Sequence, residues 1–465
     1  MKEKSDFLTK ISYGTGKFIA ELLTGGYGVL VYYFYETEQK VSVFYVSLAT
    51  IIYSVWNAIN DPLIGYLSEK NLFLSKKFGK RTPWIFIGLI LCSLAFVFIF
   101  FIPENIASKD WSLFLWMVVS VCIYDFCYSM WELNYQGVFP NKFRNSKDRT
   151  SASSVSTFIG VFGIALGSLL PQKLSVNGVK SSYFTCAIVL GTIGIICSFL
   201  ILKGVKETPE MRANYKAEYK AINKAGFFKT LTHTLKYKEF RVYLIMLLLY
   251  QSACICMTGS VKYVANGILG IKDATFISAF MLLGALVSVG VWKLVIKNFH
   301  YNNQKLLALT SFLMAGASLF MFFMNTEIGF ALGMLLWGFG FGGFWTFMSP
   351  GMADVVDSIV VQEKRREDGV LMGVRAFFIR LSYAVQAFVF YLCHTLTKYD
   401  PVRAMPDENG LYRIQEPFAR FGIKLHISIF PALFFLFAGL IILLAYPLTP
   451  KKIAENKMKL KELGL

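Results

Sequence analysis

Hydrophobic residues along the chain gather in long runs that short polar stretches separate. Three of these runs, residues 85–101, 306–325 and 427–448, contain no charged residue. Each is close to the ~20 apolar residues that an α-helix needs to cross a bilayer. Only a helix satisfies the backbone hydrogen bonds of such a run inside lipid. The pattern therefore predicts an all-α integral membrane protein.

The same pattern predicts twelve transmembrane helices in two six-helix halves. The predicted spans are 11–35, 42–67, 83–103, 111–136, 151–172, 182–203, 240–265, 274–296, 304–325, 328–350, 367–397 and 424–448. A polar stretch rich in Lys, Ala and Glu follows the sixth span, so we divide the chain into 1–203, a cytoplasmic linker at 204–239, and 240–465. Two such halves form the major facilitator fold, with a substrate site between them near the bilayer midplane.

Two polar stretches outside these spans have features of their own. Residues 208–225 are expected to form a short amphipathic helix in the cytoplasm. The loop at 398–423 on the outer side is long and carries both acidic and basic residues. A partial lid is one interpretation of this loop.

Composition agrees with lipid as the solvent. Hydrophobic residues make up 55% of the chain and charged residues 16%, whereas soluble domains carry about 25% charged residues. The first apolar segment follows a polar start and precedes no small-residue cleavage site, so it is expected to be a span and not a cleaved signal peptide. We expect a multi-pass protein of the plasma membrane that works as a monomer.

The net charge of +18 comes from Lys and Arg residues that collect in alternate loops. Basic clusters occur at residues 70–81, 142–149, 203–241 and 364–366 and in the tail from residue 451. This asymmetry is that of the positive-inside rule, so we expect both termini in the cytoplasm and no nucleic-acid partner. The same charges attract anionic lipid headgroups.

Catalytic and metal-binding patterns are missing from the sequence. The eight cysteines all fall in predicted spans, where they behave as small hydrophobic residues. The four histidines are scattered over loops and helix ends, with neither a nucleophile–base arrangement nor metal-ligand spacing: His233, His300, His394 and His426. We therefore expect a protein that is not an enzyme and has no cofactor apart from a coupling ion.

Polar side chains inside the second span are expensive to bury and so indicate function. Asn57, Asn60 and Asp61 are spaced i, i+3 and i+4, which places them on one helical face. One carboxylate and two amides on one face offer oxygen ligands for a small cation or a path for a proton. The alternative is that Asp61 and Pro62 only shape the cytoplasmic end of this helix.

The first and fourth spans also carry acidic residues. Glu21 lies in the first span, and Asp125 and Glu132 lie seven residues apart on the fourth, nearly on one face. Trp131 neighbours Glu132. Each acid could bind a substrate, or could pair with a basic residue and hold the bundle together.

The second half contributes basic and aromatic candidates. Arg375 and Arg380 lie on the eleventh span and could bind an anionic or hydroxylated ligand or neutralise a buried acid. Trp345 on the tenth span could stack on the apolar face of a sugar ring, or could simply pack. Glycines in the first and tenth spans permit close helix contact or bending.

Residues 56–66, W-N-A-I-N-D-P-L-I-G-Y, and residues 78–84, F-G-K-R-T-P-W, resemble the signature of the glycoside–pentoside–hexuronide:cation symporters. Melibiose permease is a well-known bacterial member. Residues 13–16, 352–357 and 367–369 fit the same family, so the resemblance covers most of the chain. It implies the major facilitator fold and cation-coupled transport of a sugar.

The resemblance also implies roles for single residues. Glu21 falls at an acidic sugar-binding position and Trp345 at a sugar-stacking position. Arg380 falls at a lysine position between the sugar and cation sites. Asn60 and Asp61 match the cation site, and Asp125 and Trp131 lie near the sugar-binding part of helix four. A cytoplasmic motif that would fasten the two halves in the outward-facing state comprises Gly65, Lys80, Arg81, Asp354 and Asp357.

Three positions depart from the family pattern. Asn57 stands where the family has a cation-binding aspartate, which favours a proton, or no coupling, over sodium. Ser156 and Thr157 occupy the region of a sugar-binding arginine. Arg375 is an additional charge, and with Arg380 it would suit a sugar acid, a sulfated sugar or another anion.

We therefore predict a secondary active transporter that symports a sugar or sugar derivative with a proton or sodium by alternating access. One alternative is a lysolipid carrier, because the animal lysophosphatidylcholine carriers share the patterns of helices two and eleven. Another is a sensor that binds a sugar without moving it.

Overall fold

The computed structural model describes residues 6–68, 78–106, 109–143, 146–208, 211, 233–298, 302–364, 368–407 and 412–462. Over these residues the chain is almost entirely helical, and the only β pairing is an isolated bridge between Pro406 and Tyr412. The chain forms two compact units, Met1–Lys224 and Ala225–Leu465. Nearly all of the helix expected at 208–225 lies outside the described residues.

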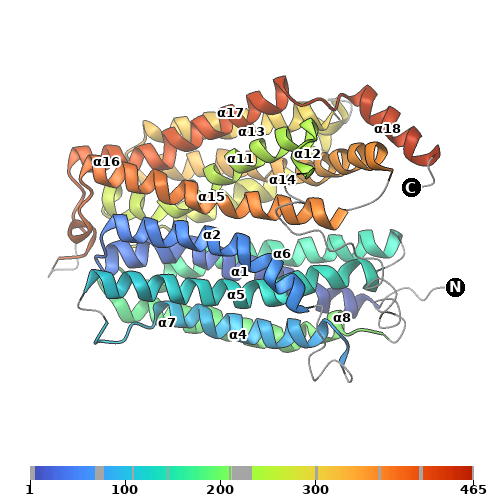
Figure 1. Cartoon of the computed structure of the whole chain (residues 1–465). Helices are drawn as coiled ribbons and strands as arrows, with labels where there is room; N and C mark the ends of the chain where they lie inside the picture. Colours follow the sequence, from blue (N-terminus) through green and yellow to red (C-terminus); the bar gives the residue numbers. More distant parts are fainter. Residues whose placement is uncertain are drawn as a thin grey trace. The chain divides into compact units, whose positions relative to one another are not determined.

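The described part of the first unit contains six long helices. They are α1 (Phe7–Tyr33), α2 (Val43–Ser68), α4 (Thr82–Phe100), α5 (Asp110–Lys142), α6 (Ser146–Leu174) and α7 (Lys180–Leu200), drawn in blue to green in Figure 1. A π-helical turn, η1 (Phe34–Glu38), extends α1, and a single turn, α8 (Leu202–Val205), follows α7. Helix α1 packs on α6 and α7, α2 packs on α5, and α4 packs on α5 and α7.

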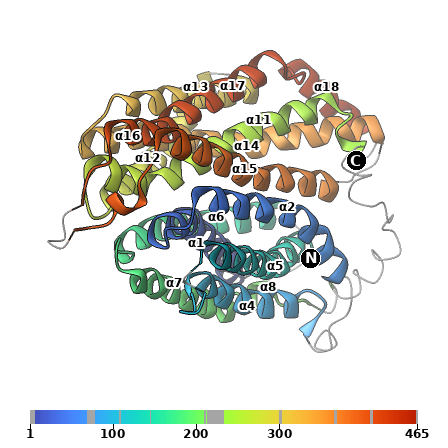
Figure 2. The ribbon, with the colours of Figure 1, turned by 60° about the vertical axis from the view of Figure 1, so that its left-hand side comes forward.

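The second unit repeats this order. Its elements are α11 (Lys238–Tyr263), η2 (Val264–Leu269), α12 (Thr275–Asn298), α13 (Asn303–Phe322), α14 (Glu327–Glu363), α15 (Asp368–Thr397), η3 (Pro401–Ala404), α16 (Pro417–Lys424), η4 (Leu425–Ile429), α17 (Phe430–Leu444) and α18 (Pro450–Glu462). Helix α11 packs on α15 and α17, α12 packs on α14, and α13 packs on α14 and α17. Figures 1 and 2 both show α13 and α17 side by side. The first long helix of each unit ends in a π-helical turn. The two units therefore share the order in which their helices pack and this local feature.

Eleven described segments are long and apolar enough to cross a membrane. Helix α1 is not among them, because Lys17, Glu21 and several Gly and Tyr residues lower its hydropathy. It is nevertheless 27 residues long and largely buried against α6 and α7. The all-α membrane fold predicted from sequence is confirmed, with α1 as the twelfth long helix.

Several helix boundaries differ from the predicted spans, and those of α14 and α16 differ most. Helix α14 continues through Pro350 to Glu363, so Asp354 and Asp357 lie on the helix and do not follow it. Hydropathy marks where a helix leaves lipid, whereas the backbone hydrogen bonds continue into the polar region. Helix α16 begins at Pro417, a residue suited to a first helical turn, so the last part of the loop expected at 398–423 is helical.

Glycines bring helix backbones into direct contact in both units. A Cβ on Gly338 of α14 would lie 2.0 Å from the carbonyl oxygen of Met281 on α12, and one on Gly284 would lie 2.1 Å from that of Leu335. In the first unit, a Cβ on Gly167 of α6 would lie 2.8 Å from the carbonyl oxygen of Leu22. The glycines of α14 and α6 therefore serve close packing, as small residues do in membrane bundles.

Replacing Gly338 with Ala is expected to lower thermal stability, because α12 and α14 must separate to admit the methyl group. Overpacking of this kind costs about 1–3 kcal/mol. The thermal unfolding temperature of purified protein in detergent measures the effect. Gly316→Ala on α13 is the matched control, since a Cβ there meets nothing within 4 Å. Equal unfolding temperatures for the two variants would show that the α12–α14 contact can accommodate the added methyl group without a loss of stability.

Candidate functional site

A buried polar cluster lies where α2 packs on α5. Asn57 and Asn60 of α2 and Asp125 of α5 are each at most 1% exposed. The side-chain amide of Asn57 donates to Asp125 Oδ1. The amide of Asn60 donates to Asp125 Oδ2 at 2.9 Å and to the Asp125 carbonyl oxygen at 3.1 Å. Both carboxylate oxygens of Asp125 therefore accept hydrogen bonds from the face of α2 that the spacing predicts.

Asp61 extends this cluster by one residue on α2. Ser129 of α5 donates its hydroxyl to Asp61 Oδ1 at 2.7 Å. Asp125 and Ser129 are spaced i and i+4 and share one face of α5. We call Asn57, Asn60, Asp61, Asp125 and Ser129 the α2–α5 polar cluster. The resemblance places Asp125 near a sugar site, and the structure places it in contact with two of the three residues expected to serve a cation.

Two oxygens of the α2–α5 polar cluster have unused acceptor capacity. Asn57 Oδ1 and Asn60 Oδ1 are buried and accept no hydrogen bond from the described residues. A buried polar atom without a partner costs about 1–3 kcal/mol. Amide oxygens, a carboxylate and a hydroxyl are the ligand types that a hard cation prefers. The arrangement can therefore hold a small cation beside Asp125.

Aromatic rings surround this part of the first unit. Tyr27 of α1 stacks on Tyr53 at 5.3 Å and on Tyr124 at 5.6 Å between ring centroids. Trp131 is completely buried and packs beside Tyr128 and Tyr135. In this conformation Trp131 is thus a packing residue of the first unit, and its predicted contact with a substrate stays a prediction.

The other acidic candidates of the first unit interact with residues on their own helices. Glu21 forms an ion pair with Lys17, one turn earlier on α1, and remains partly exposed. Glu132 accepts a hydrogen bond from Gln136 of α5. Glu21 is therefore a charged, accessible group, whereas Asp125 is enclosed.

The candidates of the second unit lie on α14 and α15. Trp345 is 41% exposed and makes a T-shaped contact with Phe341 at 6.1 Å between ring centroids, so its ring is partly accessible. Arg375 is half-buried; its Nη2 lies 3.7 Å from Met348 Sδ, and its Nε finds no hydrogen-bond acceptor among the described residues. Arg380 is half-buried further along α15. An anionic or hydroxylated ligand would satisfy the unused donor of Arg375.

The start of α4 is held by a residue that the motif does not include. The Glu207 carboxylate, after α8, accepts hydrogen bonds from the backbone N–H groups of Lys80 at 2.8 Å and Arg81 at 2.5 Å. A carboxylate at a helix N-terminus accepts hydrogen bonds from free N–H groups and interacts favourably with the positive end of the helix dipole. Gly79, with φ of +98°, provides the left-handed turn that this approach requires. Glu207 is one of four glutamates in the linker at 204–239, so the sequence alone does not single it out.

The other members of the cytoplasmic motif are placed separately. Gly65 lies on α2. Asp354 of α14 is buried and accepts a hydrogen bond from the side chain of Asn303 at 2.9 Å, and Asp357 lies one turn further. Near Glu207, burial lowers the pKa of Lys142, whose Nζ donates to the Lys206 carbonyl at 2.7 Å. That the motif fastens the two halves together stays a prediction.

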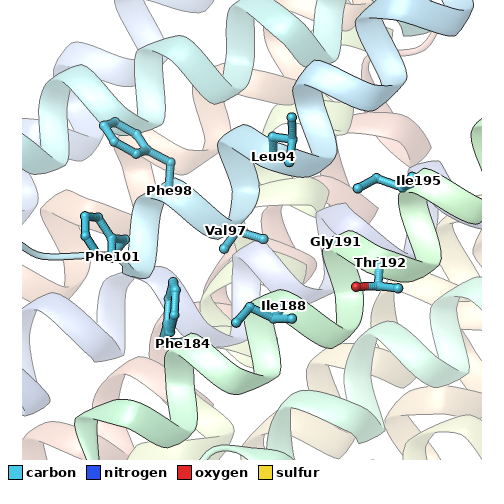
Figure 3. Close-up of a pocket in the computed structure, with 9 residues that line it drawn as sticks. All are labelled: Leu94, Val97, Phe98, Phe101, Phe184, Ile188, Gly191, Thr192 and Ile195. Carbon is cyan, nitrogen blue, oxygen red and sulfur yellow. The ribbon is translucent and has the colours of Figure 1, made fainter.

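A groove of about 340 Å³ lies between α4 and α7 in the first unit. Figure 3 shows its lining, in which Thr192 contributes a hydroxyl among side chains such as Phe98, Phe184 and Ile188. None of the predicted site residues lines it. Its apolar surface on two membrane-spanning helices is that of a lipid-facing crevice and not of a polar substrate site.

Residues 12–450 match the family model described as MFS/sugar transport protein. The chain belongs to this family. It is therefore a multi-pass membrane transporter of the major facilitator superfamily, as the resemblance implies. A small-molecule substrate and the lipid bilayer follow from that membership.

Several known proteins are similar to this member of the family. The sodium-dependent lysophosphatidylcholine symporter 1 of Gallus gallus is 19% identical, over 99% of this chain and 90% of that protein. The lactose permease of Lactobacillus helveticus is 22% identical, over 76% of this chain and 56% of that protein. A crystal structure of a mutant form of the nucleoside transporter NupG has a TM-score of 0.64 at 11% identity, over 93% of this chain and 99% of that one. The NupG structure supports the fold alone.

Proposed function

We propose that this transporter symports a sugar or sugar derivative with sodium, and that the α2–α5 polar cluster binds the sodium ion. The observation that carries the proposal is the pair of buried, unpartnered oxygens, Asn57 Oδ1 and Asn60 Oδ1, beside the Asp125 carboxylate. A proton on Asp125 would supply one O–H donor and could satisfy at most one of the two amide oxygens. A sodium ion would use several oxygens at once.

The choice of sodium revises the preference for a proton. That preference rests on Asn57, which removes one carboxylate from the face of α2. The structure supplies a carboxylate from α5, since Asn57 contacts Asp125 directly. With Asp61 joined through Ser129, two carboxylates belong to the α2–α5 polar cluster. One carboxylate balances the charge of a sodium ion, and the second carboxylate and the neutral oxygens offer further ligands of the type that a hard cation prefers.

A polar, sugar-like substrate is supported by the residues of α14 and α15 and by the relatives. Trp345 has a partly accessible ring, which could stack on the apolar face of a pyranose. Arg375 has a donor without an acceptor, which suits a hydroxyl or an acid group. The family description names sugar transport, and two relatives are lactose permeases. We propose an acidic sugar as the first compound to test.

A lysolipid carrier is the second candidate. The observation that favours it is the similarity to lysophosphatidylcholine symporters over 99% of this chain, which is more of the chain than the lactose permeases match. Sodium coupling fits this candidate equally, because those relatives are named sodium-dependent. Plasma-membrane location, cytoplasmic termini, alternating access and a monomeric state remain part of the proposal for both candidates.

Uptake into proteoliposomes tests the proposal. Neutral sugars, acidic sugars and lysophosphatidylcholine are offered under an inward sodium gradient, an inward proton gradient, or neither. Sodium-driven accumulation of a sugar is the expected result. Accumulation driven by protons alone would overturn the sodium assignment. Sodium-driven uptake of lysophosphatidylcholine without any sugar uptake would replace the first candidate with the second.

A further inference from the structure

Two histidines far apart in sequence meet inside the second unit. His394 of α15 and His426 of η4 are 3% and 0% exposed, and their Nε2 atoms lie 3.2 Å apart. His426 Nδ1 lies 2.6 Å from the hydroxyl oxygen of Ser260 on α11. Both histidines lie within membrane-spanning segments, where ionisable groups are expensive and by default functional.

The surroundings of Ser260 set the direction of these hydrogen bonds. Two backbone carbonyl oxygens, those of Cys256 and His426, lie within hydrogen-bonding distance of the Ser260 hydroxyl, and a carbonyl can only accept. The single hydroxyl hydrogen of Ser260 therefore goes to a carbonyl, and Ser260 Oγ accepts from His426 Nδ1–H. His426 Nε2 is then an acceptor, so His394 Nε2 must donate. His394, His426, Ser260 and the carbonyl that accepts from Ser260 therefore form one directional series of hydrogen bonds, from α15 through η4 to α11.

Aromatic rings enclose this series of hydrogen-bonded residues and favour a positive charge bound there. The His426 ring lies 4.5 Å from Phe390 and 5.5 Å from Tyr263, and the His394 ring stacks on Tyr399 at 4.4 Å. Aromatic faces attract cations at such distances. Among the described residues, the titratable or charged groups on the neighbouring elements include Cys256, Lys262 and Tyr263 of α11, Cys393 of α15, Tyr399 after it, and Lys424 of α16. Lys424 is directed to Asn325 Oδ1 at 2.8 Å.

We propose that His394 and His426 form a binding site for a single proton, separate from the α2–α5 polar cluster. In the neutral pair one hydrogen lies between the two Nε2 atoms, so the added proton binds His394 Nδ1, the remaining ring nitrogen without a hydrogen. The hydrogen between the Nε2 atoms can then sit on either ring, so the two rings share one positive charge. A second proton would place two positive charges within 3.2 Å in a buried site and is excluded. The site joins the last turns of α11 and α15 and the π-helical turn η4 within the span Pro417–Leu444, so its charge acts on three membrane-spanning helices at once.

Histidine NMR tests the site without any transported compound. The chain has four histidines, so ring signals of protein labelled at histidine can be assigned by single substitutions. We expect the ring ¹⁵N shifts to report Nδ1–H for His426 and Nε2–H for His394 at about pH 8. On acidification both rings should shift together with one midpoint. In Ser260→Ala, His426 loses its acceptor, so its tautomer preference should be lost.

His233→Gln is the matched control, because the His233 side chain is partly exposed and contacts Glu363 instead of another histidine. This substitution should leave both buried signals unchanged. His426→Gln should move the midpoint of the His394 pH titration, because the proton can then no longer be shared between two imidazole rings. Two separate midpoints in the unsubstituted protein, no titration between about pH 4 and pH 8, or the reverse tautomers would each overturn the proposal.

Discussion

Replacing Asp125 with Asn is expected to abolish sodium-driven accumulation of the substrate. The substitution keeps the size of the side chain but removes the carboxylate that Asn57 and Asn60 contact. Loss of a charged ligand of this kind weakens binding by about 3 kcal/mol, which corresponds to about 100-fold in affinity. Uptake by proteoliposomes under an inward sodium gradient is the measurement. Equilibrium exchange of the same substrate should persist, because exchange needs no net sodium movement.

Asp110→Asn is the control for this result, since it removes an exposed carboxylate from the first turn of the same helix. It should accumulate substrate at the unsubstituted rate. Full sodium-driven accumulation by Asp125→Asn would show that the α2–α5 polar cluster is structural. Loss of exchange as well as accumulation would indicate that Asp125 binds the substrate, as the family resemblance implies.

The fold could be predicted from sequence because lipid imposes a simple rule on composition. Runs such as 85–101 cannot exist in a bilayer except as helices, so hydropathy alone locates α4. Hydropathy does not locate the end of a helix that continues beyond the bilayer into the polar region. Nothing in the hydropathy of residues 351–363 distinguishes a helix from a loop, and α14 continues through them. The first span is predictable despite its charges and glycines, because its apolar segment is long and aromatic.

The candidate site could be predicted only within one helix. The i, i+3 and i+4 spacing of Asn57, Asn60 and Asp61 determines that they share a face of α2. Their contact with Asp125 depends on the depth at which α5 packs on α2, which no local pattern contains. The same limit applies to the histidine pair, since 32 residues separate His394 from His426 and 166 separate His426 from Ser260. Each of these residues looks isolated in the sequence.

Replacing Asn57 with Asp is expected to make the stability of the protein depend strongly on sodium. The variant places a second carboxylate in contact with Asp125, and two like charges in a buried site repel each other. A sodium ion between them removes the repulsion, so the variant should bind sodium at least about tenfold more tightly than the unsubstituted protein. Thermal unfolding temperatures of purified protein, measured across a series of sodium concentrations balanced with choline, report this affinity.

Asn134→Asp separates this effect from the general cost of a buried carboxylate. Asn134 is a buried residue of α5 whose amide donates to the Met130 carbonyl, outside the α2–α5 polar cluster. Its variant should be destabilised at every sodium concentration, because the hydrogen bond that the Asn134 amide donates joins it to its own helix and not to the α2–α5 polar cluster. If acid restores Asn57→Asp and sodium does not, one proton is shared between the two carboxylates, and the cluster is a proton site. Equal rescue of both variants by sodium would mean that the ion acts elsewhere, because Asn57 contacts Asp125 whereas the Asn134 amide donates to the Met130 carbonyl.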